Sequence, residues 1–90
     1  MQTQARKSRL PSWVRAERRE LHVRLTRAMG SRSQRSWARE LGIPAQNISR
    51  YLSGGTSPHA DFLIYLARHE SINLNWLLLG EGRMRRRPES

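Results

Sequence analysis

The sequence has no cysteine, a single phenylalanine and few acidic residues, and its apolar runs are short. Without cysteine, disulfide bonds and thiolate metal sites are excluded, which is compatible with a reducing cytosol. Every uninterrupted apolar run is far below the roughly 20 residues that a membrane-spanning helix needs, so we expect no membrane partner. The basic N-terminus has no apolar segment behind it and shows no secretory signal.

Patterns for catalysis and metal binding are also missing. His22, His59 and His69 have no carboxylate or cysteine at metal-ligand spacing. No segment resembles a nucleophile elbow, and no base stands beside a nucleophile. We therefore expect no enzymatic activity, no metal, no cofactor and no small-molecule substrate.

Positive charge is abundant and unevenly distributed. The 90 residues include 17 basic and 7 acidic side chains, a net charge of +10, and 16 of the basic residues are arginine. Residues 1–50 carry 12 basic and 3 acidic side chains, whereas residues 51–82 carry 1 and 3. Charge segregated in this way favours a polyanionic partner, because the release of counterions from phosphates drives non-specific binding to nucleic acids. The length allows one domain with a single core.

The stretch from Ser33 to Gly54 has the pattern of two short helices joined by a tight turn. Ser33 is a good N-cap for the first helix, because its side chain can accept a hydrogen bond from an amide of the first turn. Gly42 suits a left-handed residue that ends this helix, and Pro44 fixes φ where the second helix begins. The pattern predicts a helix-turn-helix within an all-helical fold.

The second helix of this motif, which we expect from about Pro44 to Leu52, has one apolar side and one polar side. At about 100° per residue, Ile48 and Leu52 share the inward side. Amide and guanidinium groups can each pair with two atoms of a base edge. A solvated face of an amphipathic helix is the alternative interpretation, but the adjoining turn and the positive charge favour base contacts. The polar side carries Gln46 and Arg50, with Asn47 and Ser49 at their flanks.

Residues 21–82 resemble the DNA-binding domain of the lambda-type phage repressor and Cro superfamily, also called the xenobiotic-response-element family. The motifs that carry the resemblance are Ser33-Gln34, Ala38 to Ile43, Ile48 to Gly54, and Asn73 to Gly82. The last of them is similar to the closing signature of CI-type repressors. The chain departs from the family pattern at Pro44 and Ala45, where members more often have a Ser or Thr cap and a polar base-contacting residue. The resemblance implies a five-helix, lambda-repressor-like domain.

For DNA, the resemblance implies that the second motif helix lies in the major groove and that a dimer binds a near-palindromic operator. The base contacts are then Gln46, Arg50, Asn47 and Ser49, with Ala45 by position. The glycines and hydroxyls after this helix would approach the DNA backbone, since no Gly-Lys-Ser/Thr follows to make a nucleotide loop. The phosphate contacts expected are Gln34, Arg35, Arg32, Ser53, Gly54, Gly55 and Thr56, with Arg24 and Arg27 as further candidates.

Further helices are expected on both sides of the motif. They run from Ser12 to about Met29, from Ser57 with Pro58 at the first helical position, and from near Asn73 to Gly80. The last of them has five large apolar residues in six positions. An exposed cluster of this kind marks an interface, so we expect part of it to form a homodimer; filling of the domain's own core is the alternative. These residues are Leu74, Trp76, Leu77, Leu78 and Leu79.

The chain divides into a flexible basic arm at 1–10, a helix-turn-helix domain at 11–82 and a basic, solvated tail at 83–90. The arm either follows phosphates or the minor groove, or is a disordered tail. We expect a cytoplasmic, nucleoid-associated transcriptional regulator, bacterial or phage-encoded, of the phage or prophage repressor type. Two alternatives stay open. One is an antitoxin or adaptor that binds a protein through residues 74–79, and the other is an RNA-binding protein that uses its arginines alone.

Overall fold

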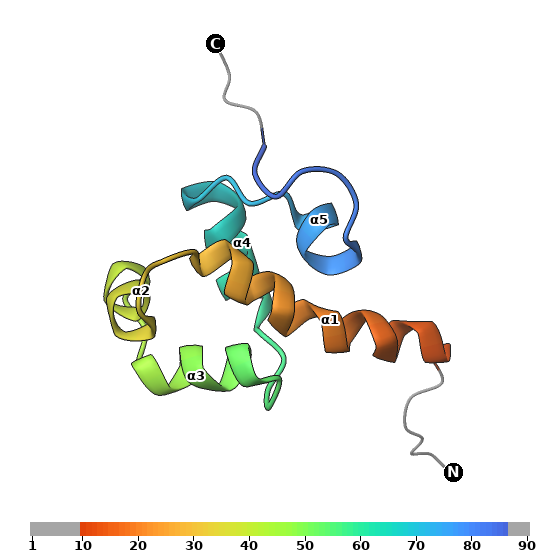
Figure 1. Ribbon diagram of the computed structural model, residues 1–90, viewed down its shortest axis with the longest axis horizontal. Helices are drawn as coiled ribbons and strands as arrows, with labels where there is room; N and C mark the ends of the chain where they lie inside the picture. The colour runs from red at the N-terminus through yellow and green to blue at the C-terminus, as the bar shows by residue number, and fades with distance from the viewer. Residues whose placement is uncertain (1–9, 87–90) are drawn as a thin grey trace.

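The computed structural model describes residues 10–86, in which five helices surround one hydrophobic core (Figure 1). The helices are α1 (Ser12–Met29), α2 (Gln34–Leu41), α3 (Ala45–Ser53), α4 (Ala60–His69) and α5 (Leu74–Leu79). This confirms the prediction of an all-α, five-helix domain. Over residues 10–86 no helix is long and apolar enough to cross a membrane. Most of the expected N-terminal arm, residues 1–9, lies outside the described residues.

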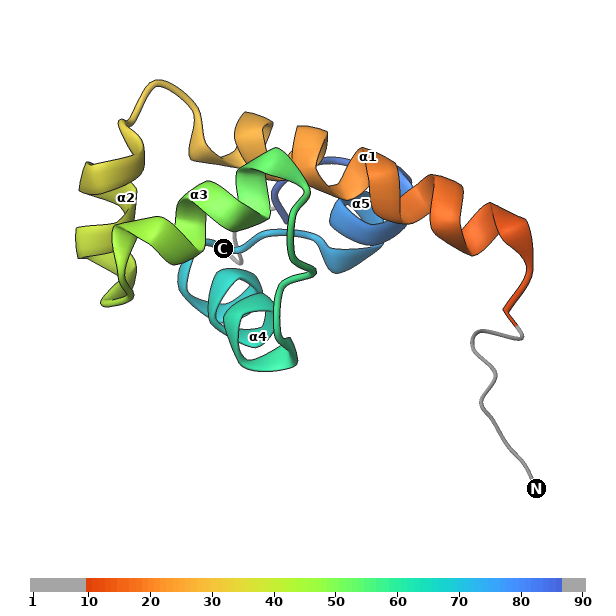
Figure 2. The ribbon, with the colours of Figure 1, turned by 90° about the horizontal axis from the view of Figure 1, so that it is seen from below.

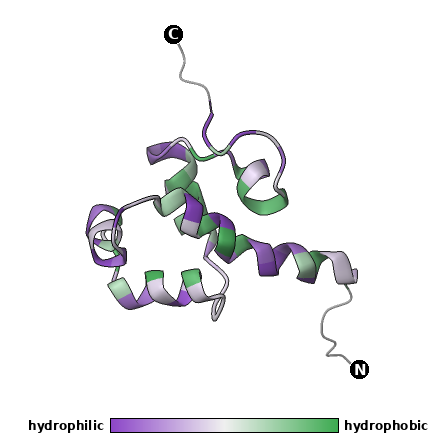
Figure 3. Ribbon diagram, viewed as in Figure 1, coloured by the Kyte–Doolittle hydropathy of each residue, from purple (hydrophilic) through white to green (hydrophobic). Residues whose placement is uncertain are grey.

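The core lies between α1 and the other four helices. Seen from below, α3 lies in front of α1, and α4 lies at the edge of the molecule opposite α1 (Figure 2). Hydrophobic residues line the sides of the helices that face this centre, and hydrophilic residues cover the outer sides (Figure 3). The largest fully buried side chains are Trp37, Leu25, Ile48, Leu66, Ile72 and Leu77.

The helix ends follow the local signals in the sequence. The Ser33 side chain accepts a hydrogen bond from the amide of Ser36 at 3.0 Å and caps α2. Gly42 is left-handed at φ 73°, and the next amide, that of Ile43, returns to the Ala38 carbonyl at 3.1 Å. Gly80 ends α5 in the same conformation, at φ 76°. The predicted cap and both glycine stops are confirmed.

Two predicted boundaries were wrong. The fourth helix begins at Ala60 rather than Pro58, because the backbone stays extended through the N-cap His59, whose side chain makes no capping bond. The domain does not stop at residue 82, since Arg85 forms an antiparallel bridge with Ile72 and Met84 packs on the core. The first four residues of the predicted tail are therefore part of the fold, and residues 87–90 lie outside the described range.

A buried carboxylate joins three segments that are distant in the sequence. Glu70 follows α4, and its side chain is only 8% exposed. Both its oxygens accept from Arg32, in the α1–α2 loop, at 3.1 Å, and one also accepts from the indole N–H of Trp37 in α2 at 2.9 Å. Arg85 lies 3.5 Å from the other oxygen. The Arg32 guanidinium also lies over the Trp37 ring, 5.3 Å from its centroid.

The surroundings of Glu70 keep it ionised. Burial alone would raise the pKa of this carboxyl, but hydrogen bonds from Arg32 and Trp37, and the charges of Arg32 and Arg85, outweigh burial and lower the pKa below its ordinary value. A carboxyl with a lowered pKa in the folded state stabilises the fold above its unfolded pKa. That stabilisation is lost as the pH falls through the folded pKa.

Replacing Glu70 by Gln should therefore lower the free energy of unfolding by about 2 to 4 kcal/mol at pH 7, because the Arg32 charge and its donors lose their partner. The difference from the wild-type chain should shrink as the pH falls below about 4.3, the ordinary pKa of a glutamate, and through the lowered pKa of the folded state, where the wild-type carboxyl also becomes neutral. Urea unfolding at several pH values, followed by circular dichroism, measures both effects.

The matched control is Glu40→Gln. Glu40 pairs with the same arginine at 2.8 Å, but its side chain is 49% exposed. An exposed pair contributes at most about 1 kcal/mol, so this variant should remain close to wild type. Equal losses for the two variants would show that burial of the carboxylate at Glu70 has no special role.

Candidate nucleic-acid interface

The helix α3 presents one polar face to solvent and one apolar face to the core. Ile48 is fully buried and Tyr51 is 5% exposed, whereas Leu52 is only half-buried. Leu52 packs against the core, so the predicted inward side of Ile48 and Leu52 is confirmed, and Tyr51 is a further inward residue that the sequence pattern did not single out. Tyr51 points inward because its ring packs on Phe62, with centroids 4.9 Å apart. The predicted base-contacting side chains lie on the outside, with Gln46, Ser49, Arg50 and Ala45 exposed and Asn47 half-buried.

Helix α2 holds α3 in place through its own buried side. Ala38 is 3% exposed, and helices α2 and α3 are in contact. Gln34 and Arg35 are exposed at the start of α2, where the first amides have no acceptor within the helix. Such a helix end attracts anions.

The loop after α3 uses most of its own donors. The amide of Gly54 donates to the Tyr51 carbonyl at 3.3 Å, and that of Gly55 to the Arg50 carbonyl at 3.0 Å. The Ser53 hydroxyl also donates to the Arg50 carbonyl, at 3.1 Å. These bonds close the C-terminal end of α3. Neither amide is therefore free to donate to a phosphate, which removes the N–H groups of Gly54 and Gly55 from the expected phosphate contacts.

Helix α1 and this loop line a cavity of about 140 Å³. The ring Nδ1 of His22 lies 3.1 Å from the Leu52 carbonyl at the end of α3, and Arg18 Nη1 lies 3.5 Å from the Ser57 hydroxyl. Arg19 lines the same cavity. The sequence pattern did not single out Arg18 or Arg19, because an arginine on an exposed helix carries no local sign of what it faces.

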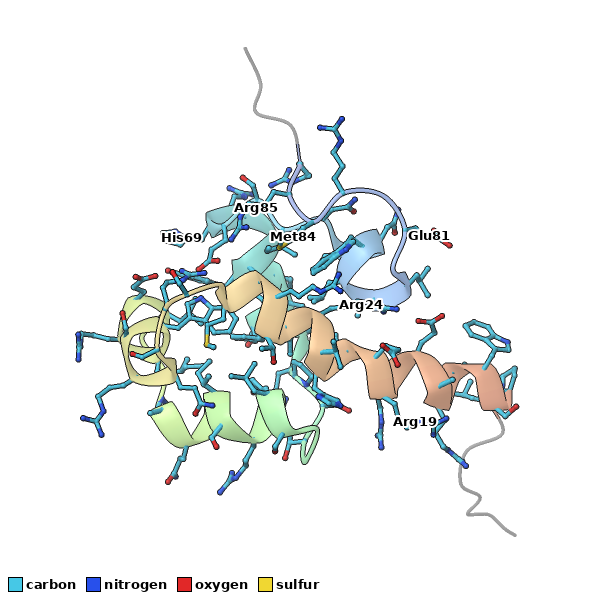
Figure 4. All side chains as sticks on the ribbon, in the orientation of Figure 1. Arg19, Arg24, His69, Glu81, Met84 and Arg85 are labelled. Atoms are coloured by element: carbon cyan, nitrogen blue, oxygen red, sulfur yellow. The ribbon has the colours of Figure 1, made fainter. Side chains whose placement is uncertain are left out.

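Two arginines that were candidate phosphate contacts have other partners. All three nitrogens of the Arg32 guanidinium donate within the chain, to Glu70, Glu40 and backbone carbonyls. Arg24 of α1 extends toward α5 (Figure 4). It pairs with Glu17 of the same helix at 3.1 Å and donates to the Leu77 carbonyl of α5 at 3.2 Å. Both side chains tie elements of the fold together, and the Arg32 guanidinium has no nitrogen left for a phosphate.

The apolar residues of α5 divide between the core and the surface. Leu77 is fully buried and Trp76 is 8% exposed, so neither offers a surface to a second subunit and both are removed from the expected dimer interface. Leu74 is half-buried against the core. Leu78 and Leu79 are 37% and 40% exposed. The residues that remain available for a partner are therefore this exposed leucine pair and part of Leu74.

The comparison with protein families finds one model that matches most of the chain. It describes the bacteriophage CI repressor helix-turn-helix domain and covers residues 22–85, which include α2, α3, α4, α5 and the C-terminal part of α1. Neither the curated proteins nor the solved structures include a significant match.

The close contact between α1 and the end of α3 gives a direct test. Gly54 has φ 84°, and a Cβ at this position would lie 3.1 Å from Cδ2 of His22. Gly54→Ala should therefore cost about 1 to 2 kcal/mol in thermal or urea unfolding.

Gly55→Ala is the control for this change. Gly55 has no positive φ, and its nearest neighbour would be the Ser53 hydroxyl at 3.5 Å. The control should stay within about 0.5 kcal/mol of wild type, as most substitutions away from special backbone positions do. If Gly54→Ala were equally mild, α1 and α3 would not be in tight contact at this point.

Proposed function

The chain belongs to the bacteriophage CI repressor helix-turn-helix family, and we propose that it represses transcription by binding a near-palindromic operator as a dimer. The family is one of DNA-binding regulators. The observation that carries the proposal is the polar outer face of α3, a helix that packs on α2, and the side chains of this face have no partner within the described residues. A helix with such a face fits the major groove of B-DNA.

The base contacts that we propose follow from the chemistry of this face. Arg50 can donate two hydrogen bonds to guanine, and Gln46 can pair with the two groups of an adenine edge. Arg50 forms no ion pair with the described carboxylates, so its guanidinium does not have to break an ion pair before it binds a base. Asn47 and Ser49 lie at the flanks and assist, while Ala45 offers only a methyl group to the base edge.

Phosphate contacts position the domain without reading sequence. We assign them to the exposed start of α2, Gln34 and Arg35, and to the hydroxyl of Thr56 in the loop after α3. Arg27 on α1 is exposed and stays a candidate. Ser53 is a weaker candidate, because its hydroxyl already donates to a carbonyl of α3.

The dimer follows from the symmetry of such operators. Two recognition helices about 34 Å apart reach successive major grooves on one side of B-DNA. Leu78 and Leu79 at the end of α5 supply the exposed apolar surface for a second subunit. A protein partner of a different kind, as in an antitoxin or adaptor, would use the same surface, and the oligomeric state distinguishes the two.

A selection from random duplexes, followed by binding measurements, tests the base contacts. Arg50→Ala should lose about 1 to 3 kcal/mol of affinity for the selected site and relax the preference at one base position. The control is Arg68→Ala, which removes one exposed positive charge from α4. It should change neither the affinity for the selected site nor the preference at any base position. Equal losses for Arg50→Ala on the selected site and on random DNA would make Arg50 a phosphate contact.

Sedimentation equilibrium tests the dimer. The wild-type chain should self-associate, and the double change Leu78→Ser and Leu79→Ser should raise the dissociation constant on the order of tenfold or more, because apolar area is removed from the interface. Ile64→Ser is the control, since Ile64 is 62% exposed on α4. A wild-type chain that stays monomeric on DNA, or that purifies with a stoichiometric protein of another sequence, contradicts the homodimer.

A further inference from the structure

We propose that Arg18 and Arg19 of α1, together with the hydroxyls of Thr56 and Ser57, hold a phosphate of the DNA backbone beside the C-terminal end of α3. This inference rests on the proposed function, because it assumes that α3 faces a DNA duplex. It adds a backbone contact made by a helix outside the helix-turn-helix motif.

The cavity between α1 and the loop after α3 provides the place. Its lining combines the two arginines with the hydroxyls of the loop, and the ring of His22 closes the side next to Gly54. The cavity has a volume of about 140 Å³ and is open to solvent on one side. Arg18 already reaches across it to the Ser57 hydroxyl, 39 residues away, at 3.5 Å.

The loop after α3 offers a phosphate the hydroxyls of Thr56 and Ser57 but no positive charge. Its two glycine amides and the Ser53 hydroxyl all donate to carbonyls of α3. The C-terminal end of a helix also carries a partial negative charge, which repels an anion. Positive charge must therefore come from another element, and α1 is the element that lines the cavity with arginines.

The charges of α1 differ according to what each side chain faces. Arg24 faces α5 and is neutralised by Glu17. Arg18 and Arg19 face the cavity, and among residues 10–86 neither forms an ion pair with a carboxylate. Two arginines that line one cavity without a counter-charge favour an anion in it. A phosphodiester oxygen fits this need, because arginine donates forked, charge-assisted hydrogen bonds to phosphate.

The cavity lies on the same side of the molecule as the reading face. Arg19 points from α1 toward the edge along which α3 lies (Figure 4). The same edge, seen from below, presents α3 with the N-terminal half of α1 beside it (Figure 2). A duplex with α3 in its major groove would therefore bring its backbone to the cavity. The contact would set the register of α3 without reading a base.

The test compares variants by fluorescence anisotropy on the selected duplex and on an unrelated duplex, at several salt concentrations. Arg18→Gln with Arg19→Gln should weaken binding to both duplexes by a similar factor, on the order of tenfold. The slope of log affinity against log salt should become shallower by about 0.9, because one phosphate is no longer neutralised. Arg18→Lys with Arg19→Lys keeps both charges and should retain most of the slope.

The matched control is Arg68→Gln with Arg83→Gln. It removes two exposed charges that form no ion pair within the described residues and that lie in α4 and the C-terminal segment. A slope for the α1 variant no shallower than that of this control overturns the phosphate site, and so does a change in base preference. A wild-type chain without base preference overturns the proposed function instead, while a shallower slope on that DNA would still support the phosphate site.

Discussion

The position of the helix pair α2–α3 depends on one buried carboxylate, that of Glu70. Its oxygens accept from the Trp37 indole in α2 and from Arg32 in the loop before α2, so α2 is fixed to the end of α4. Trp37 is fully buried and packs edge-on against Phe62 of α4. Because α3 follows α2 after the turn at Gly42, the direction of its polar face follows from this contact. A buried ion pair is costly unless every group has a partner, and here the carboxylate oxygens and the indole are all hydrogen-bonded.

The sequence alone predicted the features that depend on residues close together in the chain, such as the helix caps. The Ser33 cap and the glycine stops at Gly42 and Gly80 act within a few residues, so their pattern is visible in the chain. It did not predict the Glu70 cluster, since Glu70 lies 38 residues from Arg32 and 33 from Trp37. The spacing of residues along the chain does not indicate contacts between positions so far apart.

The same limit explains the errors about arginine and leucine. Arginines that tie the fold together, such as Arg24 and Arg85, look the same in the sequence as those that face solvent. The run after Gly82 was expected to be a solvated tail, but Met84 and the bridge at Arg85 hold it on the domain. In α5, spacing alone did not separate the buried Leu77 from the exposed Leu79. Assigning these residues requires the packing of the other helices.

In the proposed complex, the duplex meets the face formed by α3, the start of α2 and the side of α1 next to the loop. The most direct test of this binding face is an NMR titration with a selected duplex. It measures the change in the chemical shift of each backbone amide. We expect the largest changes at residues 34–35, 45–50 and 53–57, with smaller changes near residues 18–19. Changes concentrated on α4 or on residues 83–86, with α3 unaffected, would contradict it.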